Sequence, residues 1–140
     1  MGKQTQFVVQ QLTGFTEKGI RRLSLEVHAE LVSAPSEGGT PVDTGWARAN
    51  WIPSIGAANG ALAGTRQAAE RGSINLSMAQ RGLALIATRY RLKQGPVFIS
   101  NGVPYITELN DGSSAQAPAG FVQSAILRAI GTTVRELRVV

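Results

Sequence analysis

Asp43, Thr44 and Gly45 form the short motif of this chain that has a catalytic association. An Asp-Thr-Gly turn carries the catalytic carboxylate of aspartic proteases, in which two carboxylates face each other and share a proton, and a homodimer can supply one from each copy. Trp46 argues against this chemistry, because those enzymes have a small Ser or Ala after the glycine. The triad also follows a helix stop instead of ending an apolar strand. A three-residue match is a weak signal.

The same segment has a structural interpretation as a rigid corner between a helix and a strand. Pro41 forces Thr40 out of the helical region of the backbone. Asp43 can accept hydrogen bonds from the amides that follow it, and Gly45 can take a positive φ. We prefer this interpretation, because it explains the residues by local backbone requirements alone.

Other catalytic and metal-binding chemistry has little support in the sequence. The chain has no cysteine, which excludes disulfides, thiolate catalysis and sulfur-ligated zinc, and it has one histidine, His28. Glu108 and Asp111 lie close together, but two carboxylates alone form a poor cage for a hard cation, and a solvated helix end is the simpler interpretation. No glycine-rich loop precedes a Lys-Ser or Lys-Thr pair. We expect no cofactor, no metal and no enzymatic activity.

The positive charge is concentrated in one stretch. The 140-residue chain carries a formal net charge of +5, and the stretch from residue 66 to residue 93 has that same net charge, with one acid, Glu70. Its basic residues are Arg66, Arg71, Arg81, Arg89, Arg91 and Lys93. Such a stretch can face phosphate or an acidic partner, or it can be an ordinary solvated helix face. Tyr90 is its one aromatic residue, which leaves little for base stacking.

Hydrophobic spacing predicts the elements that would position these residues. Apolar residues recur every three or four positions from Thr16 to about Ser33, with Thr16 as a plausible N-cap, and again over 77–91. Alternation predicts a strand over 46–52, and a short apolar run predicts another over 96–100. A third helix should begin at Pro118 and run toward Arg138, with an inward face of Val122, Ile126, Ala129, Ile130, Thr133 and Leu137.

These elements predict one domain over residues 1–140, of the α+β class, with a small antiparallel sheet packed by about three helices. We expect a flexible N-terminal arm over 1–13, in which Phe7 to Val9 form a short strand or remain part of the arm. A second mobile segment is expected over 56–75, because residues 56–64 are small and rich in glycine. No apolar run approaches the ~20 residues that cross a bilayer, and no secretory signal is evident, so we expect a soluble protein without membrane contact.

Three segments, taken in order, resemble the neck or tail-completion proteins of long-tailed bacteriophages, also called head–tail joining or tail-component proteins. They are 40–51, 97–106 and 109–122, and the likeness extends over roughly residues 15 to 138. The matching positions include Pro41, Asp43, Gly45, Trp51, Pro104, Tyr105 and Pro118. Trp46 departs from the family, which commonly has a smaller or basic residue there, and 56–64 resembles a variable loop.

The resemblance implies a structural protein of the virion with a fold similar to tail terminators and no catalytic residues. Its partners would be further copies in a ring, with six as the expected number, and the adjacent head-completion or connector and tail-terminator or tail-tube proteins. The protein would be assembled in the bacterial host cytoplasm and would lie at the head–tail junction, where phage DNA passes with transient contact. The basic stretch would face that channel or an acidic neighbouring ring. Two alternatives remain: a tail terminator that caps the tail tube, and a free basic nucleic-acid-binding domain.

Overall fold

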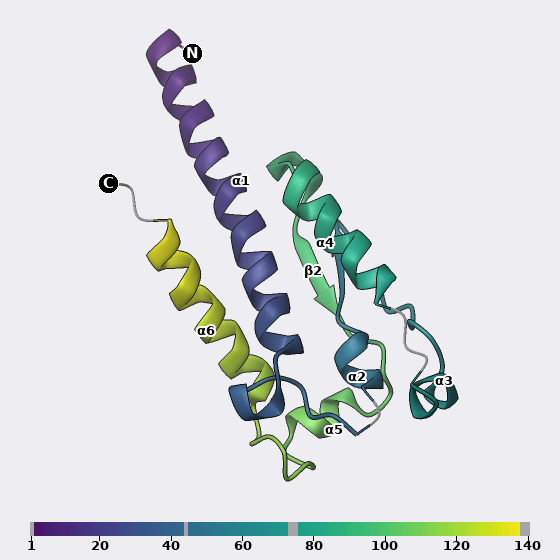
Figure 1. Cartoon of the computed structure of the whole chain (residues 1–140). Coiled ribbons are helices and arrows are strands. Elements are labelled where there is room, and N and C mark those ends of the chain that lie inside the picture. The colour runs from purple at the N-terminus through teal and green to yellow at the C-terminus, as the bar shows by residue number, and fades with distance from the viewer. Residues whose placement is uncertain (1, 44, 73–75, 138–140) are drawn as a thin grey trace.

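Three long helices and a short two-stranded sheet make up most of the structure, a computed structural model that describes residues 2–43, 45–72 and 76–137 (Figure 1). The α+β class expected from the sequence is confirmed. The helices are α1 (Lys3–Val32), α2 (Trp46–Ala49), α3 (Arg66–Glu70), α4 (Ser77–Arg89), α5 (Ile106–Asn110) and α6 (Phe121–Glu136). The strands are β1 (Ile52–Ile55) and β2 (Val97–Ser100), and two 3-10 turns are η1 (Pro35–Glu37) and η2 (Leu92–Gln94).

The sheet is an antiparallel pair that α4 covers. Ile52 is opposite Ser100, and Ile55 is opposite Val97. In the middle of α4, a Cβ at Gly82 would overlap the carbonyl oxygen of Pro53, so the absence of a side chain allows the helix to lie directly against β1. The sequence predicted both α4 and β2 with nearly the observed bounds.

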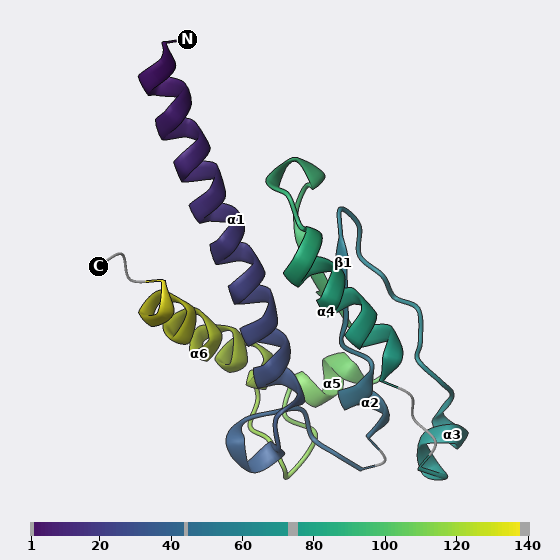
Figure 2. The ribbon, with the colours of Figure 1, turned by 45° about the horizontal axis from the view of Figure 1, so that its top comes forward.

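Helix α1 lies between α6 on one side and α4 on the other (Figures 1 and 2). It runs antiparallel to α6, and the Nε of Arg128 on α6 donates a hydrogen bond of 2.8 Å to Glu30 on α1. On the other side, Arg21 donates two hydrogen bonds, of 2.6 and 3.2 Å, to the carbonyl oxygen of Tyr90 at the end of α4. These bonds tie α1 to both neighbours.

Two clusters of buried side chains form around the two tryptophans. Trp51 packs with Leu31 of α1 and with Ala117, Phe121 and Ala125. Trp46 and Ala47 pack with Ala69 of α3 and with Val103. Both tryptophans are therefore core residues, and they connect the segment after α1 to the helices by packing.

Helix α1 begins at Lys3, so residues 3–13 are helical and Phe7 to Val9, expected as a short strand or as part of an arm, do not form a strand. Residues 3–13 contain neither proline nor glycine and are rich in glutamine, which tolerates a helix well. Thr16 is not an N-cap. It lies inside the helix, where its hydroxyl donates to the carbonyl oxygen of Leu12 at 2.8 Å.

The expected strand over 46–52 is also wrong, because residues 46–49 form α2 and β1 begins only at Ile52. Trp46, Ala47 and Ala49 are all buried, so the alternation in the sequence did not separate an inner face from an outer one. Short apolar runs rich in alanine are ambiguous between helix and strand. The expected mobile segment 56–75 includes a further helix, α3, and its residues 73–75 lie outside the described part of the chain.

Helix α6 begins at Phe121, after Gly120 with a φ of +79°, so Pro118 precedes the helix instead of starting it. Its buried face consists of Phe121, Ala125, Ala129 and Thr133. The sequence placed Ile126 and Ile130 inward, yet they are 38% and 42% exposed. Small residues on the buried face bring the two helix backbones close together, which turns the larger isoleucines outward.

Among the described residues, no helix combines the length and the apolar character that crossing a lipid bilayer needs.

Gly45 provides a test of the corner. Its φ is +85°, and no atom lies within 4 Å of the place where a Cβ would be, so substitution there costs backbone strain without a steric clash. We expect Gly45→Val to lower the free energy of unfolding by about 1 to 3 kcal/mol in a denaturant titration. The matched control is Gly60→Val, because Gly60 also has open space and has no positive φ. Equal stability of the two variants would contradict the strained corner.

Candidate functional site

The corner that follows α1 is held by a buried threonine. The hydroxyl of Thr40 donates to the carbonyl oxygen of Leu31 at 2.6 Å, and it accepts a hydrogen bond of 2.8 Å from Nε1 of Trp51. The backbone amide of Thr40 donates to the same carbonyl at 3.0 Å. Thr40 is 0% exposed, so these bonds form away from water. The carbonyl at the end of α1 and the Trp51 indole are thereby joined through one hydroxyl.

Asp43 lies on the exposed side of this corner, and Thr44 lies outside the described residues. A cavity of about 70 Å³ beside Asp43 is lined in part by Trp46 and Tyr105, whose ring centroids are 6.0 Å apart. Pockets for small ligands are commonly ~300 Å³ or larger. Burial raises the pKa of Tyr105, and the Asp43 carboxylate acts in the same direction while the Arg66 guanidinium opposes both. The surroundings of Asp43 fit a packed corner better than a peptide-binding cleft.

The three sequence segments that resemble the phage family meet at this corner. Nδ2 of Asn101, from the second segment, donates to the carbonyl oxygen of Ala47 at 2.8 Å. Gln116, from the third, exchanges two hydrogen bonds of 2.9 Å with the backbone of Val42. Ala117 packs in the core against Trp51. Segments far apart in the sequence therefore form one contiguous unit.

The predicted prolines and tyrosine differ in their placement. Pro41 is buried and Tyr105 is half-buried, whereas Pro104, in a turn, and Pro118, in an irregular segment before α6, are exposed. Pro104 follows Val103, which is 2% exposed and belongs to the second core cluster. The exposed prolines therefore contribute by restricting the backbone conformation and not by packing in the core.

Asn50 is a structural residue that sequence reasoning missed. It is fully buried, and its Oδ1 accepts a hydrogen bond of 2.6 Å from the amide of Ala63, while its Nδ2 donates at 2.8 Å to the carbonyl oxygen of Trp46. This side chain fastens the glycine-rich loop to α2. Its signal in the sequence is a lone polar residue between Ala49 and Trp51, which alone does not identify its partners.

Asn110 is a second missed residue, and it organises the start of α6. Its Oδ1 accepts from the amide of Val122 at 3.0 Å, and its carbonyl oxygen accepts from the amide of Gly120 at 2.7 Å. The nearby Glu108 and Asp111 are both exposed. In the described part of the chain, no three His, Cys, Asp or Glu side chains gather in an arrangement that could hold a metal ion.

His28 is half-buried on α1, beside a cavity of about 590 Å³ that Arg48 also lines. Burial lowers the pKa of His28, and a hydrogen bond to the backbone of Trp51 acts in the opposite direction. Its Nε2 is buried without a hydrogen-bond partner among the described residues. The neutral imidazole is therefore favoured, as in a packed core histidine.

All six residues of the basic stretch are exposed: Arg66, Arg71, Arg81, Arg89, Arg91 and Lys93. They lie in or next to α3, α4 and η2, and these elements lie on the side of α1 opposite α6 (Figures 1 and 2). Because α3 and η2 lie toward opposite ends of α4, the charges are distributed along an edge instead of forming one compact cluster. Arg66 pairs with Glu70 at 3.3 Å, an exposed contact that adds little to stability.

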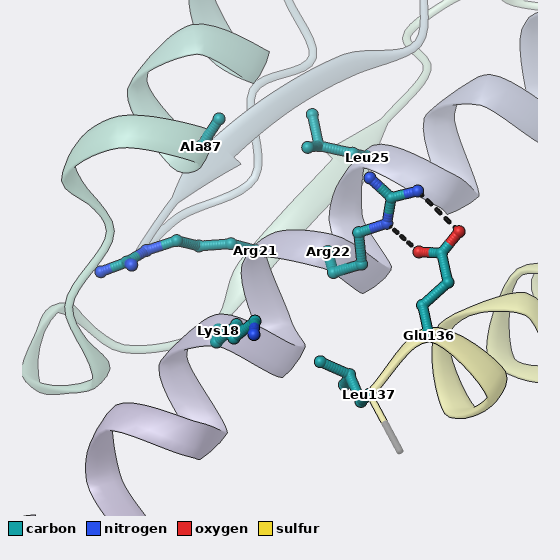
Figure 3. Close-up of a pocket in the computed structure, with 7 residues that line it drawn as sticks. All are labelled: Lys18, Arg21, Arg22, Leu25, Ala87, Glu136 and Leu137. Carbon is teal, nitrogen blue, oxygen red and sulfur yellow. Dashed lines mark hydrogen bonds and ion pairs between the residues drawn. The ribbon is translucent and has the colours of Figure 1, made fainter. Parts of the chain in front are cut away.

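Another group of cations surrounds a cavity of about 390 Å³ where α1 meets the end of α6 (Figure 3). Arg22 forms a two-pronged hydrogen bond with Glu136, which raises the pKa of Arg22, and also pairs with Glu26 at 2.7 Å. Arg21 points away from this pair and bonds the carbonyl oxygen of Tyr90. Arg22 joins α1 to α6, and Arg21 joins α1 to the end of α4. Both arginines around the cavity therefore have structural partners within the chain.

Comparison of the chain with family models, curated proteins and solved structures finds no match in any of the three.

Asn50 gives a second test. We expect Asn50→Asp to lower the free energy of unfolding by about 3 kcal/mol, because a buried carboxylate would face the Trp46 carbonyl without a donor. Asn59→Asp is the matched control, since Asn59 lies in the same loop and its Oδ1 only accepts, from the amide of Ala61 at 3.0 Å. Urea titration of both variants measures the difference. If Asn50→Asp were as stable as its control, the loop would not depend on this contact.

Proposed function

We propose that this chain is a structural protein of the phage head–tail junction, a neck or tail-completion protein. In this role it forms an oligomeric ring that joins the tail to the capsid connector and lets DNA pass. The observation that carries the proposal is the meeting of the three family-like segments at one corner, through the Asn101 contact to Ala47 and the Gln116 contacts to Val42. Segments that resemble a family are more informative when they also form one structural unit.

The contacts of these segments support a structural role over catalysis. Trp51 and Ala117 lie in the core, Gly45 provides a positive φ, and Gln116 bonds backbone atoms. Each therefore has a packing or backbone task. Asp43, the residue on which a protease would depend, is exposed beside a cavity of about 70 Å³.

The six exposed cations of the basic stretch, which we call the basic edge, are compatible with the proposed passage of DNA. Its six residues are exposed, and they lie in or next to α3, α4 and η2, which lie on the side of α1 opposite α6 (Figure 1). A ring of six copies, each with a net charge of +5, would carry about +30, and its field would be felt within a Debye length of ~10 Å at moderate salt. A channel should not hold DNA tightly, so the expected contact is weak and sensitive to salt. An acidic neighbouring ring would be an equally suitable partner for this edge.

Two alternatives follow from the same features. A tail terminator would have a similar fold, and only the identity of the adjacent ring separates it from a neck protein. A free nucleic-acid-binding domain is favoured by one observation, the exposure of all six residues of the basic stretch.

The proposal is tested by measuring the mass of the wild-type protein by light scattering over a concentration series, with negative-stain images of the same samples. We expect closed rings with an open centre at high concentration. A titration with duplex DNA at several salt concentrations provides the comparison, and binding weaker than micromolar at physiological salt is expected. A monomer that binds duplex DNA at sub-micromolar affinity in physiological salt would contradict the proposal and favour the nucleic-acid-binding domain.

A further inference from the structure

The first half of α1 extends beyond the rest of the structure (Figures 1 and 2). Helix α6 ends near Gly19, where a Cβ would lie 3.2 Å from Cδ1 of Leu137. We call residues 3–16 of α1 the projection. Its large apolar side chains are between 46% and 61% exposed: Phe7, Val8, Val9, Leu12 and Phe15.

The projection is also free of charge over most of its length. No acidic or basic residue lies between Lys3 and Glu17. An exposed helix that has only solvent around it normally carries charged side chains on its outer face. Contiguous exposed apolar surface of this kind typically marks an interaction site.

The same chain carries an apolar groove. Two cavities, of about 320 and 450 Å³, adjoin at Ile20 and Leu23 and follow α1 from Phe15 to Leu31. We call this surface the groove. One wall is α6, through Ile126, Ile130 and Val134, and the other is β2, through Val97 and Ile99. Among the described residues that line the two cavities, none is charged.

The projection and the groove match in length and in chemistry. Residues 15–31 of α1 span ~24 Å at 1.5 Å per residue, and residues 3–16 span ~20 Å. No charged residue lines the groove, and the projection has none after Lys3. Both surfaces carry large apolar side chains. Val8 and Leu12 are four residues apart and lie on one face of the helix, which is the spacing of anchors in helix-in-groove recognition.

A projection cannot reach the groove of its own chain, because both belong to one continuous helix, Lys3–Val32. The occupant must come from another molecule. A specific interface buries roughly 1,000 Å² or more, and a buried aromatic side chain accounts for ~150 to 250 Å². The exposed apolar side chains on the projection and on the α6 wall make a contact of that size feasible for a second copy.

We propose that the projection of one copy lies in the groove of a second copy. The two surfaces meet at Phe15 and Thr16 and otherwise consist of different residues, so the contact is heterologous: each copy offers a projection to one neighbour and a groove to another. Repetition of such a contact closes a ring when the rotation between copies allows it. The inference deepens the proposed function. The closing of the ring rests on that proposed function, whereas the contact between two copies rests only on the projection and the groove.

Two variants with altered surfaces test the contact. Val8→Lys with Leu12→Lys alters the projection, and Ile126→Lys with Ile130→Lys alters the groove; all four positions are exposed, so folding should survive. We expect each variant alone to be monomeric in sedimentation velocity, with association weakened about thirtyfold or more. The control is Leu85→Lys, an exposed leucine on α4 outside both surfaces, which should assemble as the wild type does.

Mixing the two variants gives the decisive result. One copy then keeps an intact groove and the other an intact projection, while the two lysine-bearing surfaces repel each other. We expect a one-to-one dimer that grows no further. Circular dichroism of each variant, unchanged in helix content, would show that the loss of assembly is not a loss of fold.

Three results with the variants would overturn the contact. These are assembly of both variants like the wild type, normal assembly of the groove variant alone, which indicates that projections pair with each other, and a mixture that remains monomeric. If both variants formed the same rings as the wild type, the proposed contact would be wrong but the proposed ring would stand. A wild type that is monomeric at every concentration and binds DNA weakly would also remove the contact, whereas the junction function is contradicted only by tight DNA binding.

Discussion

The hydrogen bonds around Thr40 hold together the parts of the molecule on which everything else depends. One buried hydroxyl joins the carbonyl oxygen of Leu31, at the end of α1, to the indole of Trp51, at the start of the sheet. Loss of that hydroxyl would leave the Trp51 indole without a partner away from water, whereas the Leu31 carbonyl would keep only its bond from the backbone amide of Thr40. An unsatisfied buried donor costs far more than an exposed hydrogen bond. Trp51 in turn packs against Phe121, the first residue of α6. The direction of α1 relative to the sheet and to α6 therefore depends on this corner.

Away from the corner, where Leu31 and Phe121 are buried, the contact between α1 and α6 buries small or polar residues and leaves large apolar residues of α6 exposed. Ser24 and Thr133 are buried, while Ile130 and Val134 are exposed. A monomer that only needed its own core would bury the larger side chains, since apolar area removed from water is the main stabilising term. The arrangement is understandable if the outward surface is completed by another molecule, so that stability and assembly draw on the same pair of helices.

The sequence predicted the features that depend on local patterns, namely α4, β2, the α+β class and the positive φ of Gly45. The corner leads into helix α2, whereas a strand was expected there. The sequence did not predict the hydrogen bonds of Asn50 and Thr40, whose partners lie in other elements. Asn50 is fixed by Ala63, and Thr40 by Leu31 and Trp51, which no spacing rule connects. The inward face predicted for α6 was only partly correct: Ala129 and Thr133 are buried, but Ile126 and Ile130 are exposed, and Ala125 is buried instead. Periodicity favours the largest apolar residues, whereas close helix packing selects small ones. The three segments resemble the phage family only when taken together in order, and their contacts with one another appear only in the folded structure.

The central claim is that the corner is a fixed scaffold and that α1 presents the surface through which copies assemble. Hydrogen–deuterium exchange, measured on one sample below and above the concentration at which it associates, tests both halves together. The account predicts slower exchange on association in residues 3–16 and in α6, with the amides of residues 40–50 equally protected in both states. Slowing confined to α3, α4 and η2, with exchange in α1 unchanged, would contradict it.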